Sequence, residues 1–255
     1  MWDPGTYLAY ADERTRPARD LLAAVDVADP AYVVDLGCGT GTSTEILAAR
    51  WPRAEILGLD SSAEMIGAAG ATEHVRYEVG DVRDWRPDRP VDVIFSNALF
   101  QWVPGHLDLF EEWLPSLAPG GRLAIQVPGN FDAPSHALLR QVCGSPRWRD
   151  RLGAFAARRE AALEPGRYVE RLARPGRPLD VWETTYLHLL GGEDPVLRWV
   201  RGTALRPVLA ALDGDPAGAA EFVAEYGALV REAYPAGAAG TVLPFRRIFV
   251  VVGNP

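Results

Sequence analysis

The 255-residue sequence contains no lysine, so arginine supplies all 26 of its basic side chains. Aspartate and glutamate together number 34, and the formal net charge is −8. Because binding to a phosphate backbone needs clustered cations, this balance argues against nucleic acid as a partner. Cysteine is also scarce: the chain has only Cys38 and Cys143. Two cysteines so far apart provide neither a disulfide framework nor the spacing of a metal site. We therefore expect no nucleic-acid partner and no bound metal.

Long apolar runs are also missing from the sequence. No stretch approaches the roughly 18 consecutive apolar residues that cross a membrane. The first residues, Met-Trp-Asp-Pro-Gly, lack the basic and then apolar pattern of a secretory leader. No internal repeat and no low-complexity linker divides the chain. We expect a single domain over residues 1–255 that is monomeric and cytoplasmic, without a membrane partner.

The most informative stretch is a glycine-rich turn between two regular elements. Residues 33–41 read Val-Val-Asp-Leu-Gly-Cys-Gly-Thr-Gly, and the helical pattern of residues 42–50 follows directly. An apolar strand that leads through such a turn into a helix presents a nucleotide-like ligand in a doubly wound sheet. The turn therefore predicts a ligand site.

The charge near this turn indicates which ligand it holds. A dinucleotide turn reads G-x-G-x-x-G and binds a pyrophosphate on backbone N–H groups, whereas here the third glycine, Gly41, comes one residue early. The carboxylate of Asp35, two residues before the first glycine, repels a pyrophosphate and attracts an ammonium group. S-adenosylmethionine carries an ammonium and a sulfonium and has no phosphate. Asp60 follows the next apolar run, where a carboxylate can accept hydrogen bonds from both hydroxyls of a ribose.

The ordered motifs Asp35-Leu-Gly-Cys-Gly-Thr-Gly, Asp60 and Gly80-Asp81-Val82 resemble those of class I S-adenosylmethionine-dependent methyltransferases. The resemblance implies an α/β fold with a doubly wound, mostly parallel, seven-stranded sheet of the Rossmann-like type. It also implies that Asp81 accepts a hydrogen bond from the adenine amine. The residues expected to bind the cofactor are Asp35, Gly37, Cys38, Gly39, Gly41, Asp60, Ser61, Asp81, Val82 and Asn97.

Hydrophobic periodicity places the elements of such a fold along the chain. The expected strands are 33–36, 55–59, 74–79, 91–96, 122–127, 179–189 and 243–252, and the last two should pair antiparallel at one edge. The expected helices are 16–25, 42–50, one from residue 63, one ending before 118, one or two within 132–160, and 168–173. Residues 96–102 follow the fourth strand and should face the methyl group, since the carboxyl ends of the strands line the ligand crevice.

Two helical segments lie outside the predicted sheet. Residues 194–234 alternate helical patterns with Gly and Pro breaks and are too long for a hairpin loop. We therefore predict that residues 190–240, inserted before the last strand, form a helical lid over the substrate. In the resembling fold a helical leader, here residues 1–30, lies over the ligand pocket.

The histidines bear on the kind of methyl acceptor. An amine or hydroxyl must lose a proton, whereas a carboxylate at pH 7 is already a nucleophile. His106, His136 and His188 are the candidate bases, but the sequence sets none of them in a constellation with a partner acid. We interpret them as capping, core or surface residues. The lack of a base favours an acceptor that is already anionic.

A narrower resemblance covers nearly the whole chain. The sequence is similar to the methyltransferases that form a monomethyl ester of trans-aconitate or a similar small tricarboxylate. It departs from them at Thr40 and in the Ala-, Gly- and Arg-rich stretch 144–164. The motifs that carry the similarity are Trp2-Asp-Pro-Gly-Thr-Tyr-Leu, Glu13-Arg-Thr-Arg-Pro, Asp60-Ser-Ser-Ala-Glu-Met, Asn97-Ala-Leu-Phe-Gln-Trp-Val-Pro-Gly-His, Gln126-Val-Pro-Gly-Asn-Phe, Pro134-Ser-His, Val181-Trp-Glu-Thr-Thr-Tyr-Leu-His and Pro244-Phe-Arg-Arg-Ile-Phe.

A trianionic substrate needs cationic donors, and the arginine fork matches carboxylates well. An arginine clamped on the attacking oxygens would lower their nucleophilicity, so arginines should hold the spectator carboxylates while neutral donors orient the reacting one. The candidate substrate-binding arginines near predicted crevice segments are Arg16, Arg206 and Arg247. The candidate neutral positioning residues are Tyr7, Trp102 and Tyr186.

Three alternatives stay open at this stage. A malonyl-carrier-protein methyltransferase also esterifies a carboxylate, but it would need a basic rim for its acidic partner, which the net charge of −8 disfavours. A small-molecule O- or N-methyltransferase would need a base or a desolvated nucleophile. A protein that binds S-adenosylmethionine without catalysis tends to lose the acidic residues of the site, yet Asp35, Asp60 and Asp81 all stand here.

Overall fold

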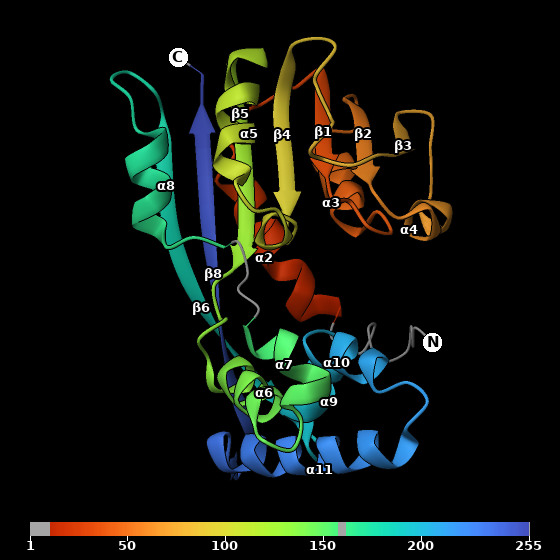
Figure 1. Ribbon diagram of the computed structural model, residues 1–255. Helices are drawn as coiled ribbons and strands as arrows, with labels where there is room; N and C mark the ends of the chain where they lie inside the picture. Colours follow the sequence, from red (N-terminus) through yellow and green to blue (C-terminus); the bar gives the residue numbers. More distant parts are fainter. Residues whose placement is uncertain (1–10, 158–161, 255) are drawn as a thin grey trace. The chain divides into compact units, whose positions relative to one another are not determined.

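The computed structural model describes residues 11–157 and 162–254 (Figure 1). The strands are β1 (Tyr32–Leu36), β2 (Glu55–Asp60), β3 (Val75–Val79), β4 (Val91–Asn97), β5 (Leu117–Pro128), β6 (Leu179–Leu190), β7 (Ala236–Gly237) and β8 (Gly240–Gly253). The α-helices are α2 (Ala11–Ala23), α3 (Thr42–Arg50), α4 (Ala63–Ala68), α5 (His106–Trp113), α6 (Pro134–Gly144), α7 (Arg149–Ala157), α8 (Pro165–Leu172), α9 (Pro195–Arg201), α10 (Leu205–Ala211) and α11 (Pro216–Ala233). Two short 3₁₀ helices, η1 (Phe100–Trp102) and η2 (Leu114–Ser116), complete the elements.

The strands form one sheet in the order β3-β2-β1-β4-β5-β8-β6, with β7 paired to β8. The five strands from β3 to β5 run parallel, and β8 pairs antiparallel with β5. This arrangement confirms the predicted doubly wound, mostly parallel sheet. From β1 the chain continues to β2 and β3 on one side of the sheet, and from β4 it continues to β5 on the other side. The topological switch point, where such sheets bind ligands, therefore lies between β1 and β4.

Several element boundaries differ from the sequence-based expectation. Strand β5 begins at Leu117 instead of Arg122, because Leu117 already pairs with Val91 ahead of a register shift in β4. Helix α2 begins at Ala11 and contains Pro17 in its interior, where the expectation placed the helix at 16–25. The two-residue strand β7 is too short to give a periodic signal. The described part of the region 132–160, up to residue 157, contains two helices, α6 and α7, which is one of the two expected arrangements.

The described chain divides into two compact units. The sheet unit comprises residues 12–129, 162–184 and 247–254, and the helical unit comprises residues 130–157 and 185–246 with Ala11. Strands β6 and β8 contribute residues to both units. The segment predicted as a lid, 190–240, lies within the helical unit together with α6 and α7.

In the sheet unit, apolar side chains from β1, β2, β4, β5 and β8 pack against α5 and α8, which lie in front of the sheet in Figure 1. Phe110 and Trp113 of α5 and Tyr168 and Leu172 of α8 are fully buried in this core. The five residues of β1 are all buried, as expected for a central parallel strand that is covered on both faces.

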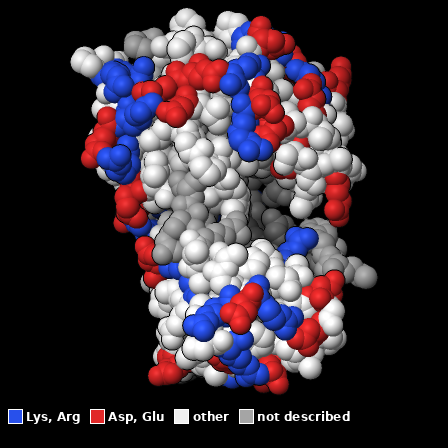
Figure 2. All heavy atoms as spheres, viewed as in Figure 1, with Lys and Arg blue, Asp and Glu red and all other residues white. Residues whose placement is uncertain are grey.

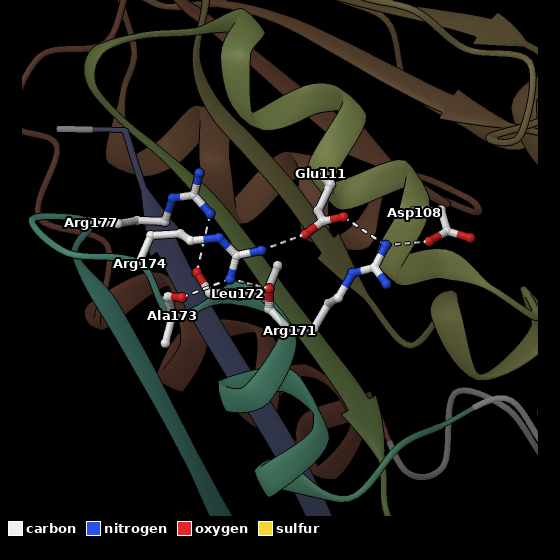
Figure 3. Close-up of polar contacts among 7 residues, drawn as sticks. All are labelled: Asp108, Glu111, Arg171, Leu172, Ala173, Arg174 and Arg177. Atoms are coloured by element: carbon white, nitrogen blue, oxygen red, sulfur yellow. Dashed lines mark hydrogen bonds and ion pairs between the residues drawn. The ribbon is translucent and has the colours of Figure 1, made fainter.

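Arginines of α8 and of the turn after it tie that helix to α5 (Figure 3). Arg171 forms ion pairs with Asp108 at 2.7 Å and Glu111 at 2.6 Å, and Arg174 reaches Glu111 at 3.1 Å. Arg174 and Arg177 also donate hydrogen bonds to carbonyl groups at the C-terminal end of α8. Carbonyl groups at this end of a helix have no intrahelical hydrogen-bond partners. Arg171, Arg174 and Asp108 are exposed and Glu111 is partly buried, so each ion pair stabilises the fold by about 1 kcal/mol or less.

The helical unit has a hydrophobic core of its own, built from α6, α7, α9, α10, α11 and the adjoining parts of β6 and β8. Trp148, just before α7, packs edge-on against Phe222 of α11 at a centroid distance of 5.3 Å. Its indole Nε1 donates a hydrogen bond to the Glu225 carboxylate at 2.8 Å. Segments that are far apart in sequence therefore share one core.

The charged side chains alternate in sign on the face that Figure 2 shows, where arginines lie beside aspartates and glutamates. None of the helices formed by the described residues combines the length and the apolar character that a membrane crossing requires.

Candidate functional site at the glycine-rich turn

The glycine-rich turn lies at the carboxyl end of β1, next to the switch point of the sheet. Gly37, Gly39 and Gly41 all have positive φ, at 72°, 57° and 91°, which is a conformation that side chains rarely adopt. A Cβ at Gly37 would lie 2.9 Å from the Cβ of Leu99, and one at Gly41 would clash with the hydroxyl of Tyr77. The turn therefore needs glycine at both positions for its path and for its space.

Asp35 lies at the base of the turn and is completely buried. Its Oδ2 accepts hydrogen bonds from Ser43 and Thr44, each at 2.7 Å, while no described residue contacts its Oδ1 through a hydrogen bond. Burial raises the pKa of this carboxyl to about 6, although the bonds from Ser43 and Thr44 oppose the shift. A cationic ligand beside Oδ1 would satisfy that oxygen and favour the ionised form.

Asp60 ends β2 and organises the other side of the turn. Its Oδ2 accepts a hydrogen bond from the backbone N–H of Gly39 at 3.0 Å, and its Oδ1 accepts one from Ser62 at 2.9 Å. Ser61 is exposed beside it, and Ser62 caps α4 through Met65. A carboxylate has about four lone-pair sites, so Asp60 keeps acceptor capacity for a ligand's hydroxyl groups.

Cys38 is buried inside the turn, with its Sγ 3.7 Å from the carbonyl oxygen of Gly39. Burial raises the pKa of this thiol, and the nearby Asp35 and Asp60 carboxylates add to the shift. The neutral thiol is not an activated nucleophile. The prediction that Cys38 contributes to the cofactor site therefore concerns its backbone and its volume within the turn.

Asp81 and Val82 follow β3, and the structure shows a partner for Asp81 that the sequence did not reveal. The Asp81 carboxylate pairs with the Arg83 guanidinium and accepts the Arg83 backbone N–H at 2.9 Å. These contacts hold the pKa of Asp81 at about 2. Val82 is buried in the core of the sheet unit. A bond from Asp81 to an adenine amine stays a prediction, and it would have to share the carboxylate with Arg83.

Asn97 ends β4 at the switch point, and the next residue is strained. Ala98 has a φ of +62°, although it carries a Cβ. Its backbone is held from two sides, because its N–H donates to the Gln126 carbonyl at 2.9 Å and its carbonyl accepts from Gln101 Nε2 at 2.6 Å. Asn97 Oδ1 and Gln101 Oε1 are buried and have no hydrogen-bond partner among the described residues. Backbone strain beside unsatisfied polar atoms is typical of a ligand site.

Comparison with known proteins assigns this arrangement to a family. Residues 33–121 match the family described as "Methyltransferase domain". The trans-aconitate 2-methyltransferase of Streptomyces coelicolor is 53% identical, with 100% of this chain and 87% of that protein covered. The enzyme of the same name from Streptomyces avermitilis is also 53% identical, with 98% and 96% covered.

The chain belongs to the trans-aconitate 2-methyltransferase family. Solved structures agree on the fold. The putative methyltransferase in complex with the Haloferax volcanii Trm112 activator has a TM-score of 0.55 at 20% identity, with 97% of this chain and 92% of that chain covered. The plantazolicin methyltransferase BpumL has a TM-score of 0.51 at 15% identity, with 96% and 84% covered.

The cofactor of this methyltransferase is S-adenosylmethionine, and the residues at the switch point fit it. The unsatisfied, fully buried Asp35 Oδ1 suits the positive charge of the cofactor. Gly39 has open space where a Cβ would stand, and Asp60, which accepts the Gly39 N–H, keeps acceptor capacity. The individual roles of these residues stay predictions.

The three arginines predicted to bind the substrate belong to different elements and differ in burial. Arg247 of β8 is buried in the sheet unit, 6% exposed, and its NH1 lies 3.4 Å from Gln126 Oε1. Arg16 is exposed on α2 and pairs with Asp20 at 3.7 Å, and Arg206 is exposed on α10 of the helical unit. Of the three predicted arginines, only Arg247 is buried, and it lies beside the buried amide of Gln126.

The three neutral candidates have different surroundings. Trp102 of η1 is 52% exposed in the sheet unit. Tyr186 of β6 is buried in the helical unit and stacks on His188. Tyr7 lies outside the described residues.

Three of the four histidines, His106, His136 and His188, lie beside aromatic rings, whereas His74 is exposed. His106 contacts the Val103 carbonyl and the Tyr168 hydroxyl, each at 3.0 Å, and burial lowers its pKa. Burial also lowers the pKa of His136, to about 4. His188 stacks on Trp199 at 5.0 Å. Among the described residues, no group of three or more His, Cys, Asp or Glu side chains is arranged to hold a metal ion.

Sequence reasoning gave no individual role to three residues of this region: Tyr77 beneath the turn, Gln126, and Gln101, which lies within the segment 96–102 expected to face the methyl group. Tyr77 shows no local signal, because its contact with Gly41 depends on the register between β2 and β3. Gln101 and Gln126, in contrast, do show a signal in the sequence. Each is an uncharged polar residue within an apolar run, and each is buried.

Proposed function

We propose that this methyltransferase transfers the methyl group of S-adenosylmethionine to a carboxylate oxygen of trans-aconitate, which yields a monomethyl ester. The observation that carries the proposal is the identity of about half of all residues, over nearly the whole chain, with proteins named for this substrate. The buried guanidinium of Arg247, whose NH1 lies 3.4 Å from Gln126 Oε1, supports an anionic acceptor, because its fork matches the geometry of a carboxylate.

S-adenosylmethionine supplies an electrophilic methyl group, whose bond to sulfur breaks as the bond to the acceptor oxygen forms. The protein's contribution is to bind, align and desolvate. We assign Asp35 to the ammonium group and Asp60 to the ribose hydroxyls. Arg247 would hold a carboxylate of the acceptor. No proton has to be removed from an ionised carboxylate, which agrees with the lowered pKa values of His106 and His136.

The wider organisation forms part of the proposal. We propose a single methyltransferase domain in which residues 190–240 act as a lid and residues 1–30 as a leader over the cofactor. We also propose a monomeric, cytoplasmic enzyme with no nucleic-acid or membrane partner. A malonyl-carrier protein as acceptor is less favoured, because the exposed arginines of the sheet unit, such as Arg76, Arg83 and Arg171, pair with local carboxylates.

The proposal is tested by incubating the purified protein with S-adenosylmethionine and a panel of acceptors. The panel consists of trans-aconitate, cis-aconitate, isocitrate, citrate and a malonyl-carrier protein, and the products are read by mass spectrometry. The expected result is a single added methyl group on trans-aconitate at the highest rate. Preferred methylation of the carrier protein, or methylation of none of these carboxylates, would contradict the proposal.

A further inference from the structure

Gln126 is a polar side chain buried in the middle of the sheet. It lies in β5, where it is completely inaccessible to solvent. Its neighbours Ile125 and Val127 belong to the hydrophobic core shared with α5 and α8. Since successive side chains of a strand point to opposite faces, Gln126 points to the other face of the sheet. The apolar packing of α5 and α8 therefore does not account for this residue.

The strand register places Gln126 between Asn97 and the strand that carries Arg247. Asn97 of β4 pairs directly with Gln126, which in turn pairs with Phe249 of β8. Arg247 is two residues from Phe249 and shares its face. With strands spaced about 4.8 Å apart, Asn97 is one strand from the glycine-rich turn of β1 and Gln126 is two. Gln126 thus lies between the switch-point residue Asn97 and the strand that carries the candidate substrate-binding residue Arg247.

Arg247 fixes the orientation of the Gln126 amide. The Arg247 NH1 group donates to Gln126 Oε1 at 3.4 Å. A guanidinium has no acceptor atom, so only the oxygen of the amide can face it. The Nε2 group therefore points elsewhere, and it is buried without a hydrogen-bond partner among the described residues. Buried donors without partners are uncommon in native proteins, and this one is held in position to donate to a ligand.

We propose that Gln126 is a substrate-binding residue whose Nε2 donates a hydrogen bond to a carboxylate oxygen of the methyl acceptor. The inference rests on the proposed function, from which it takes the carboxylate. A neutral amide binds that oxygen less strongly than a guanidinium does, so the oxygen stays nucleophilic. Arg247 acts on the reaction partly through Gln126, by holding its amide.

The experiment compares Gln126→Leu and Gln126→Glu with wild type. The leucine variant removes the donor at similar volume. The glutamate variant keeps an oxygen for Arg247 and turns the donor into a carboxylate that repels the acceptor, so it tests the inference even where the leucine variant does not fold. Gln141→Leu is the matched control, because Gln141 is exposed on α6. The measured quantities are KM and kcat for trans-aconitate, the Kd of S-adenosylhomocysteine by calorimetry, and the melting temperature.

We expect the KM for trans-aconitate to rise about 10- to 100-fold in Gln126→Leu, the range for loss of a hydrogen bond to a charged group. It should rise further in Gln126→Glu, with the Kd of S-adenosylhomocysteine unchanged in both variants. A KM within twofold of wild type would overturn the inference, as would equal losses in KM and in the Kd of S-adenosylhomocysteine, which indicate a structural role. A wild-type protein that methylates no carboxylate overturns the proposed function itself, and that failure is distinguishable because it needs no variant.

Discussion

The backbone N–H of Gly39 donates a hydrogen bond to Asp60 Oδ2 at 3.0 Å. This bond joins the glycine-rich turn after β1 to the end of β2, so one carboxylate both shapes the turn and faces the ribose position assigned to it. The turn is therefore not an independent loop. Its geometry depends on a residue 21 positions further along the chain.

Replacing Asp60 with alanine should weaken cofactor binding severely. The change removes the acceptor of the Gly39 and Ser62 N–H groups, and with it the acceptor that we propose for both ribose hydroxyls. Each hydrogen bond to a charged group contributes about 1.5–3 kcal/mol, so we expect the Kd of S-adenosylmethionine to rise about 100-fold or more by calorimetry. Asp60→Asn, which keeps one acceptor oxygen, should lose less. Unchanged affinity in Asp60→Ala would exclude the ribose role.

Asp35 should make the cofactor-free protein less stable as the pH rises. The pKa of its carboxyl is about 6 in the folded state, against 3.8 for an aspartate in water. The folded state therefore binds this proton more tightly, and the resulting stability is fully present below about pH 4 and is lost as the pH passes 6. The free energy of unfolding should fall by about 3 kcal/mol across this window. Asp35→Asn, which has no such proton, should not show this contribution.

Cofactor binding should depend on pH in the opposite direction. The ammonium group of S-adenosylmethionine favours ionised Asp35, so the affinity of wild type should fall as the pH drops below about 6. In Asp35→Asn the affinity should be lower at pH 8 and nearly constant between pH 5 and 8. If the Kd of S-adenosylmethionine changed with pH in the same way in both proteins, Asp35 would not contact the ammonium group of the cofactor.

Glycine substitutions should separate backbone strain from steric overlap. Gly37→Ala combines a φ of +72° with a clash against Leu99, so we expect a loss of about 2 kcal/mol or more in the free energy of unfolding. Gly39→Ala meets no atom within 4 Å and should lose only the strain contribution, about 1 kcal/mol. Gly67→Ala, inside α4 with open space around it, should stabilise the protein slightly. Urea denaturation measures all three, and equal effects at positions 37 and 39 would contradict the overlap.

Arg247→Lys tests whether the guanidinium fork, and not the charge alone, binds the acceptor. A lysine keeps the charge but cannot form a two-point contact with a carboxylate. We expect the KM for trans-aconitate to rise about 10-fold while the Kd of the cofactor changes little. Arg53→Lys is the control, because Arg53 is 79% exposed and paired with Asp29. An unaltered KM in Arg247→Lys and in Arg247→Ala would remove this residue from the site.

The sequence predicted the features that depend on local spacing. The boundaries of α3 match the expected 42–50, because Gly41 and Arg50 bracket a continuous helical pattern. The doubly wound, mostly parallel sheet was implied by the resemblance of the ordered motifs to class I methyltransferases, and comparison with relatives bears out that family and its cofactor.

Features that depend on register or distant packing were not predictable in this way. The place of Gln126 beside Asn97 needs the pairing of β4 with β5. Arg83 was not expected as the partner of Asp81, since the side chains of two charged residues that are two positions apart can equally well point away from each other. The extent of the helical unit also escaped prediction, because its core joins Trp148 to Phe222 across a long stretch of sequence. Periodicity within one segment does not report such contacts.

The most direct test of the account is the chemical nature of the methylated product. The protein is incubated with trans-aconitate and S-adenosylmethionine that carries an isotopic label in its methyl group, and the product is then treated with mild alkali. A carboxyl methyl ester hydrolyses under these conditions, so the account predicts that the label is released quantitatively as methanol. Label that stays attached to the product would show an ether, amine or carbon linkage and would contradict carboxyl methylation.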